Sequence, residues 1–79
     1  MVPIVRQIQH EKGAREALGR LPEPFSDAVL EQLEAFRACE LPVGDHVELL
    51  AIDGRAVRVN FFVDTDGTLW IERLGVTGP

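Results

Sequence analysis

The chain has 79 residues, a hydrophobic fraction of 46% and a formal net charge of −5. This composition predicts one small globular domain and excludes a disordered chain. The single cysteine excludes an internal disulfide, and no apolar run approaches the ~20 residues that cross a bilayer. The N-terminus lacks the basic and apolar regions of a signal peptide, so we expect a cytoplasmic protein. We also expect that a core this small gains stability from dimerisation, because association buries further apolar surface.

The N-terminal part of the chain contains an extended segment followed by an amphipathic helix. In residues 2–9, apolar residues alternate with others as in an edge strand. Pro3 also suits the first turn of a helix, but we favour the strand. Residues 11–20 repeat apolar residues at helical spacing, and the prolines of residues 21–24 end this helix. Its apolar stripe consists of Ala14, Ala17, Leu18 and Leu21.

A second amphipathic helix begins near residues 24–26 and ends before residues 39–45. Its apolar residues recur every three or four positions, and its acidic residues recur at the same spacing on the opposite side. The apolar set is Phe25, Val29, Leu33 and Phe36, and the acidic set is Asp27, Glu31 and Glu34. We therefore expect one side of this helix to be buried and the other to present carboxylates to solvent.

Three apolar-rich runs follow, at residues 46–52, 55–63 and 68–74, and we interpret them as consecutive antiparallel strands. Asp53-Gly54 joins the first two and predicts a type I′ hairpin turn, because both residues tolerate positive φ. Residues 64–67, Asp-Thr-Asp-Gly, supply the next turn. They share part of a calcium-loop pattern but lack its distal glutamate, so we expect no metal site there.

Alternation assigns the side chains of these strands to two faces. In the middle strand, Val57, Val59, Phe61 and Val63 share one face, and Arg58, Asn60 and Phe62 share the other. In the last strand, Leu69, Ile71 and Arg73 alternate with Thr68, Trp70, Glu72 and Leu74. In the first strand, either Val47, Leu49 and Ala51 or Glu48, Leu50 and Ile52 face inward. Phe62 and Trp70, with Leu50 and Ile52 as candidate neighbours, form a candidate apolar interface on the second face of the sheet.

These elements predict the α+β fold class, with two amphipathic helices packed on a three- or four-stranded antiparallel β-meander. The predicted order is strand, helix, helix, strand, strand, strand, in a single domain over residues 1–79. The alternative that leaves residues 2–9 helical gives the three-stranded form.

The negative charge is concentrated in the middle of the chain. Residues 21–53 carry eight carboxylates and one arginine. This excess disfavours direct nucleic-acid binding and predicts a basic protein as partner, such as a nucleic-acid-binding protein whose groove accepts carboxylates in place of phosphates. The size and charge of the chain are similar to those of small acidic phage inhibitors, including DNA-mimicking anti-CRISPR proteins. The candidate partner-binding residues are Glu23, Asp27, Glu31, Glu34, Glu40, Asp45 and Glu48.

The chain also resembles the RelE/ParE superfamily of toxin–antitoxin toxins. The resemblance lies in residues 17–22 (ALGRLP), residues 33–36 (LEAF), residues 53–64 (DGRAVRVNFFVD) and a last strand with Arg73 and Gly75. It implies ribosome-dependent mRNA cleavage, or a relative in which this activity has degenerated, with Arg55, Arg58 and Arg73 as the site. The chain differs from the family in its acidic charge, in Glu48 at a basic position and in having no tyrosine.

No other pattern predicts an enzyme. His10 and His46 occur without the context of a catalytic triad, and Cys39 with two distant histidines is a poor zinc set, so we expect no metal, cofactor or membrane. Three hypotheses remain. We favour an acidic inhibitor of a basic protein. The alternatives are a RelE/ParE-type toxin and a homodimeric structural domain that associates through Phe62 and Trp70.

Overall fold

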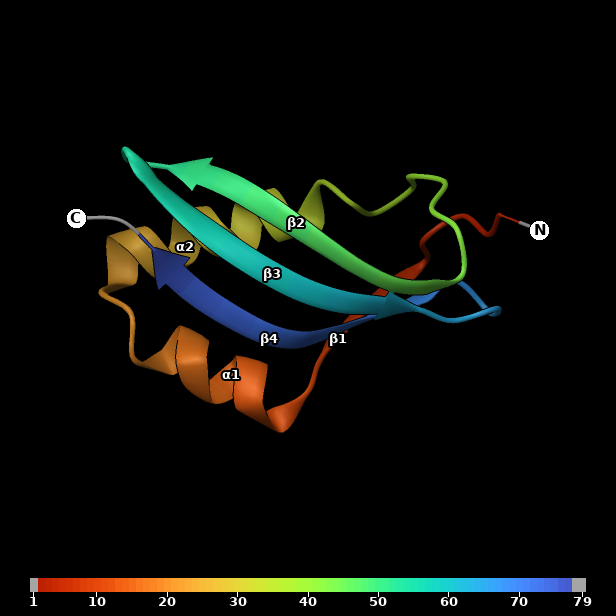
Figure 1. Ribbon diagram of the computed structural model, residues 1–79, viewed down its shortest axis with the longest axis horizontal. Helices are drawn as coiled ribbons and strands as arrows, with labels where there is room; N and C mark the ends of the chain where they lie inside the picture. The colour runs from red at the N-terminus through yellow and green to blue at the C-terminus, as the bar shows by residue number, and fades with distance from the viewer. Residues whose placement is uncertain (1, 78–79) are drawn as a thin grey trace.

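The fold is described from a computed structural model over residues 2–77 (Figure 1). Two helices and four strands follow one another in the predicted order. The elements are β1 (Gln7–His10), α1 (Lys12–Gly19), α2 (Glu23–Glu34), β2 (Gly44–Ile52), β3 (Arg55–Val63) and β4 (Thr68–Thr77). The predicted α+β class, with two helices and a sheet that includes the N-terminal strand, is confirmed.

The four strands form one sheet in the order β1-β4-β3-β2. The three C-terminal strands are the antiparallel meander that the sequence predicts, while β1 pairs in parallel with β4 and makes the sheet mixed. The N-terminal strand is shorter than residues 2–9, because Ile4 contributes only an isolated bridge to Glu40. The chain passes through both helices between β1 and the meander, so β1 can lie at the far edge of the sheet beside β4.

Both predicted turns are present. Asp53 and Gly54 have φ values of 51° and 76°, the double positive φ of a type I′ turn. In the second turn, Gly67 has a φ of 87° and its N–H donates to the Asp64 carbonyl at 3.1 Å. The Gly67 carbonyl accepts the N–H of Arg6 at 2.8 Å, which ties the N-terminal segment to the β3–β4 turn.

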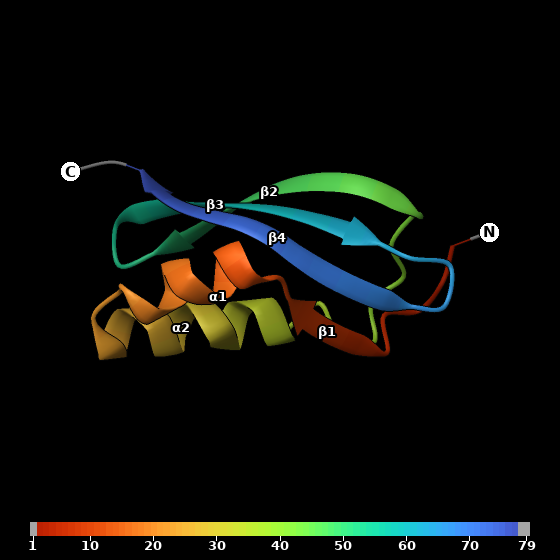
Figure 2. The same cartoon turned by 90° about the horizontal axis from the view of Figure 1, so that it is seen from below.

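The helices cover one face of the sheet and leave the other uncovered (Figure 2). α1 packs beneath β4 and β1, and α2 packs beneath β2. Phe36, just after α2, lies with its ring centroid 5.2 Å from that of Phe61 on β3. The buried apolar core consists of Val5, Ala14, Phe25, Val29, Leu33, Ile52, Val57, Val59, Phe61, Val63, Leu69 and Ile71.

The amphipathic patterns place the helices as expected. Phe25, Val29 and Leu33 are the buried residues of α2, and Ala14 is the buried residue of α1. Pro22 directly precedes α2, where its fixed φ suits the start of a helix and no intrahelical hydrogen bond is lost. No helix of residues 2–77 is long and apolar enough to cross a membrane.

Candidate functional site

The uncovered face of the sheet is assembled from alternate residues of all four strands. The strand register places its side chains in rows across the sheet. The first row holds Asp45, Phe62, Trp70 and Gln9; the second holds Val47, Asn60 and Arg73; the third holds Leu49, Arg58 and Gly75. This face therefore combines exposed apolar and aromatic groups with two arginines.

A hollow of about 280 Å³ lies on this face. It is lined by Arg58, Asn60, Arg73, Leu74 and Gly75. Gly75 stands beside Arg58 in the register and has no side chain to fill the space. A Cβ atom at Gly75 would meet nothing within 4 Å, and its φ lies outside the left-handed region. The hollow is thus open because of one glycine rather than because of a gap in the core.

Arg58 and Arg73 are both exposed, and neither forms an ion pair with any residue in the described part of the chain. The two ion pairs of residues 2–77 join Arg20 to Glu16 at 4.0 Å and Arg37 to Glu34 at 2.8 Å, both along the helical region. The guanidinium groups at the hollow therefore remain available to an anionic ligand.

A β-bulge decides that Arg73 lies on the uncovered face. The register between β3 and β4 shifts between Asn60 and Phe61, which leaves Glu72 as the extra residue of β4. The predicted alternation of β4 is therefore wrong beyond Ile71. Leu74 turns inward opposite Val59, and Arg73 turns outward opposite Asn60.

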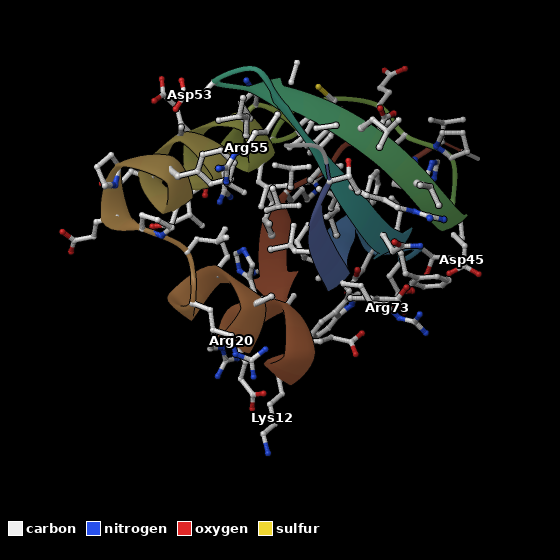
Figure 3. The ribbon with its side chains drawn as sticks, turned by 60° about the vertical axis from the view of Figure 1, so that its left-hand side comes forward. Lys12, Arg20, Asp45, Asp53, Arg55 and Arg73 are labelled. Atoms are coloured by element: carbon white, nitrogen blue, oxygen red, sulfur yellow. The ribbon has the colours of Figure 1, made fainter. Side chains whose placement is uncertain are left out.

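Arg55 lies apart from the other two arginines of the predicted toxin site. It sits next to the type I′ turn on the helix-covered side, with its guanidinium carbon 5.7 Å from the ring centroid of Phe25. Figure 3 shows Arg55 beside the start of α2 and Arg73 on the opposite side of the sheet. The structure thus brings Arg58 and Arg73 together and separates Arg55 from them. Three positions, an odd number, separate Arg55 from Arg58, so alternation alone already signals opposite faces.

Phe62 and Trp70, the two residues of the predicted apolar interface, are neighbours on the uncovered face. Phe62 lies opposite Trp70 in the register, and Trp70 keeps 37% of its surface exposed. The expected neighbours Leu50 and Ile52 are on the covered face instead, because Ile52 is buried and Leu50 packs against the core. Val47 and Leu49, which are 53% and 66% exposed, occupy the uncovered face in their place.

The seven predicted partner-binding carboxylates are exposed but do not form one surface. Glu23, Asp27 and Glu31 follow one another at four-residue spacing along α2, and Glu34 continues this row. The other three lie elsewhere: Glu40 follows α2, Asp45 is on the uncovered face, and Glu48 is on the covered side of β2. The hydrogen bonds from Arg37 hold the pKa of Glu34 below its ordinary value, so its negative charge is locally balanced.

The two histidines and the cysteine all lie away from the hollow. His10 is half-buried beneath the sheet; burial first, and then the charge of Arg15, lower its pKa, while Glu34 raises it. His46 stacks on Phe61 with centroids 5.0 Å apart, and its Nε2 lies 2.6 Å from the Pro42 carbonyl oxygen. The Cys39 thiol donates to the Ala35 carbonyl at 3.3 Å. Among residues 2–77, no three His, Cys, Asp or Glu side chains are grouped to hold a metal ion.

Two members of the hollow, Asn60 and Gly75, are not among the residues that the sequence singled out. Asn60 shares a face with Arg58 by simple alternation, so this signal is present in the sequence. Gly75 reaches the same face only because of the bulge, which no local pattern marks. Comparison of the chain with protein families, with curated proteins and with solved structures finds no match.

Proposed function

We propose that the uncovered face of the sheet binds single-stranded RNA, with a backbone phosphate held in the hollow between Arg58 and Arg73. The observation that carries this proposal is the placement around one hollow of two exposed arginines that form no ion pair with any residue from 2 to 77. Guanidinium groups present forked N–H donors that match the oxygens of a phosphate, and Asn60 adds an amide beside them.

The aromatic row next to the hollow supports a single-stranded ligand. Phe62 and Trp70 follow Asn60 and Arg73 on the same face, two positions further along β3 and before the bulge in β4. Residues two apart on a strand are separated by about 6.6 Å. A nucleotide can therefore place its phosphate in the hollow and a neighbouring base against Trp70, and bases exposed in single strands stack on such aromatic faces.

The resemblance to RelE/ParE toxins supports RNA as the ligand, since two of the three arginines that it assigns to the site of mRNA cleavage, Arg58 and Arg73, line the hollow. The residues that line the hollow are arginine, asparagine, leucine and glycine. Arginine stabilises the charge of a phosphate but does not accept a proton at neutral pH. We therefore propose a relative of these toxins that holds RNA without cleaving it.

Fluorescence anisotropy with a short labelled single-stranded RNA tests the proposal. One phosphate neutralised by the two arginines predicts a slope of about −0.7 for log K against log salt concentration, and Arg58→Ala or Arg73→Ala should each make this slope shallower. Each change should also weaken binding at low salt by about tenfold, the loss of ~1.4 kcal/mol. Arg55→Ala is the matched control, because Arg55 is on the same strand and faces the helices; its affinity for RNA should match the wild type.

Gly75→Asp provides a second test without removing a cation. The new carboxylate enters open space between the guanidinium groups, so the fold should persist in circular dichroism while RNA binding is lost. Gly75→Asn, of similar size and without charge, should weaken binding less than Gly75→Asp. Absence of RNA binding by the wild type, or equal losses in Arg55→Ala and Arg58→Ala, would reject the proposal. Gel analysis after incubation should show that the same RNA remains uncleaved.

A second candidate is the acidic inhibitor, and the row of carboxylates on α2 favours it. Glu23, Asp27 and Glu31 repeat every ~6 Å along the helix and are exposed, with no ion pair to any residue between 2 and 77. A basic groove that accepts regularly spaced phosphates would also accept this row. Reversal of Asp27 and Glu31 to Lys should abolish capture of a basic nucleic-acid-binding protein, whereas reversal of Glu11, directly before α1, and Glu16 on α1 should not. Equal capture by both double variants would exclude this candidate.

A further inference from the structure

The two edges of the sheet are protected to different degrees. On the four-residue strand β1, the Arg15 Nη2 donates to the His10 carbonyl at 3.1 Å, and directly before this strand the Arg37 Nη1 donates to the Arg6 carbonyl at 2.8 Å. At the β2 edge, the described side chains supply one such bond, from Gln32 Nε2 to the Ala51 carbonyl at 3.3 Å. An edge strand without such protection is a template for pairing with another strand.

The register shows which groups of β2 are free. Ile52 and Arg55 flank the two-residue turn, so this pair exchanges both backbone hydrogen bonds, and every second residue of β2 repeats this arrangement with β3. The alternate residues Asp45, Val47 and Leu49 direct their N–H and C=O groups outward. Among the backbone contacts outside the regular ladders of residues 2–77, none involves these three residues.

We infer that the β2 edge pairs antiparallel with the β2 edge of a second copy of this chain, with the two-fold axis at Val47. Val47 then pairs with Val47 of the partner, and Asp45 pairs with Leu49 of the partner. All of these positions direct their backbone groups outward, so each pair exchanges two hydrogen bonds. The pairing ends before Ala51, whose carbonyl Gln32 already occupies.

Two neighbouring registers are disfavoured, one by charge and one by an occupied backbone group. An axis at Glu48 would set two carboxylates opposite each other, and like charges in a cross-strand pair are destabilising. An axis at Leu49 would set Val47 opposite the occupied Ala51. With the axis at Val47, each Glu48 lies opposite the partner's His46, at a pair without backbone hydrogen bonds, where side chains approach most closely. Glu48 therefore faces an imidazole in this register instead of a second carboxylate.

The exposed side chains of β2 also favour this association. Val47 and Leu49 are the two most exposed large apolar residues of the described chain, at 53% and 66%. The paired edge brings Val47 against its own copy on the uncovered side of a continuous sheet. The interface is short, so we expect a dimer that forms and dissociates with concentration rather than a permanent one.

Sedimentation velocity over a concentration series, together with amide hydrogen exchange, tests this inference. The mean mass of the wild type should rise with concentration, and the Val47 and Leu49 amides should become protected in parallel. Val47→Pro removes the central N–H donor but leaves the ladder to β3 intact, so it should remain folded and monomeric. Val47→Ala keeps the N–H and should still associate.

Val47→Glu gives an independent test that keeps the backbone N–H. It sets two carboxylates opposite each other at the axis and should lower the association constant, even if Val47→Pro proves unstable. A wild type that is monomeric at all concentrations would overturn the inference. So would an association that survives Val47→Glu and is lost in Trp70→Glu, because the interface would then be the uncovered face. Neither outcome tests RNA binding, which the proposed function assigns to a single copy of the chain.

Discussion

The two faces of the sheet have the same backbone support and very different side chains. On the covered face, Val57, Val59 and Phe61 of β3 are fully buried against the helices. On the uncovered face, the intervening residues of the same strand, Arg58, Asn60 and Phe62, are exposed or half-buried. The comparison teaches that the covered face alone supplies the core. The uncovered face is therefore free to carry arginines and aromatic residues for a ligand.

Two adjacent phenylalanines give the largest expected contrast between the faces. Phe61→Ala should lower the free energy of unfolding by about 3–5 kcal/mol, because it opens a cavity between Phe36 and His46. Phe62→Ala on the uncovered face should cost less than about 1.5 kcal/mol. Urea denaturation followed by circular dichroism measures both. If Phe61→Ala does not fold, Phe61→Leu and Phe62→Leu provide the same comparison with smaller expected losses of stability. Equal losses in the two variants would contradict the difference between the two faces.

Two glycines of β4 and its turn give the next contrast. A Cβ atom at Gly67 would lie 2.5 Å from the Ile4 carbonyl oxygen, at a φ of 87°, so Gly67→Ala should cost at least about 1–3 kcal/mol. Gly75→Ala meets open space and replaces glycine within a strand, so it should stabilise by up to about 1 kcal/mol. Thermal unfolding of the two variants gives the sign directly. A loss at Gly75 would mean that the hollow is needed for folding.

The smallest expected effect concerns His10 of β1, whose side chain lies on the covered face of the sheet. Burial and Arg15 lower the pKa of His10, so the unfolded chain binds its proton more readily and acidification favours unfolding. The free energy of unfolding should fall as the pH drops below about 6.5, the ordinary value for histidine. Above about pH 5, Glu34 and Asp66 stay ionised in the folded chain, because hydrogen bonds lower the pKa of each. His10→Gln should flatten this part of the stability curve, and an unchanged slope would contradict the assignment.

Local patterns in the sequence account for much of this fold. Asp53-Gly54 predicts its own turn, since the positive φ values depend on those two residues. The spacing of Phe25, Val29 and Leu33 predicts which side of α2 is buried, and alternation predicts the faces of β3. These features depend on contacts between near neighbours, so the sequence carries them directly.

The candidate site depends on contacts that no local pattern contains. The bulge at Glu72 is a mismatch between two strands, and it alone brings Arg73 and Gly75 to the face that holds Arg58. The parallel pairing of β1 with β4 likewise joins residues far apart in the chain and leaves β2 as the opposite edge of the sheet.

The sequence by itself determined the class of the fold, its turns and the apolar side of each helix. Only the tertiary structure decided that Arg58 and Arg73 share a hollow, that Arg55 does not, and that the carboxylates are divided among separate surfaces. The physical reason is that hydrophobic spacing and turn chemistry act between neighbours in the chain, whereas strand register is set by the packing of the whole sheet against its helices.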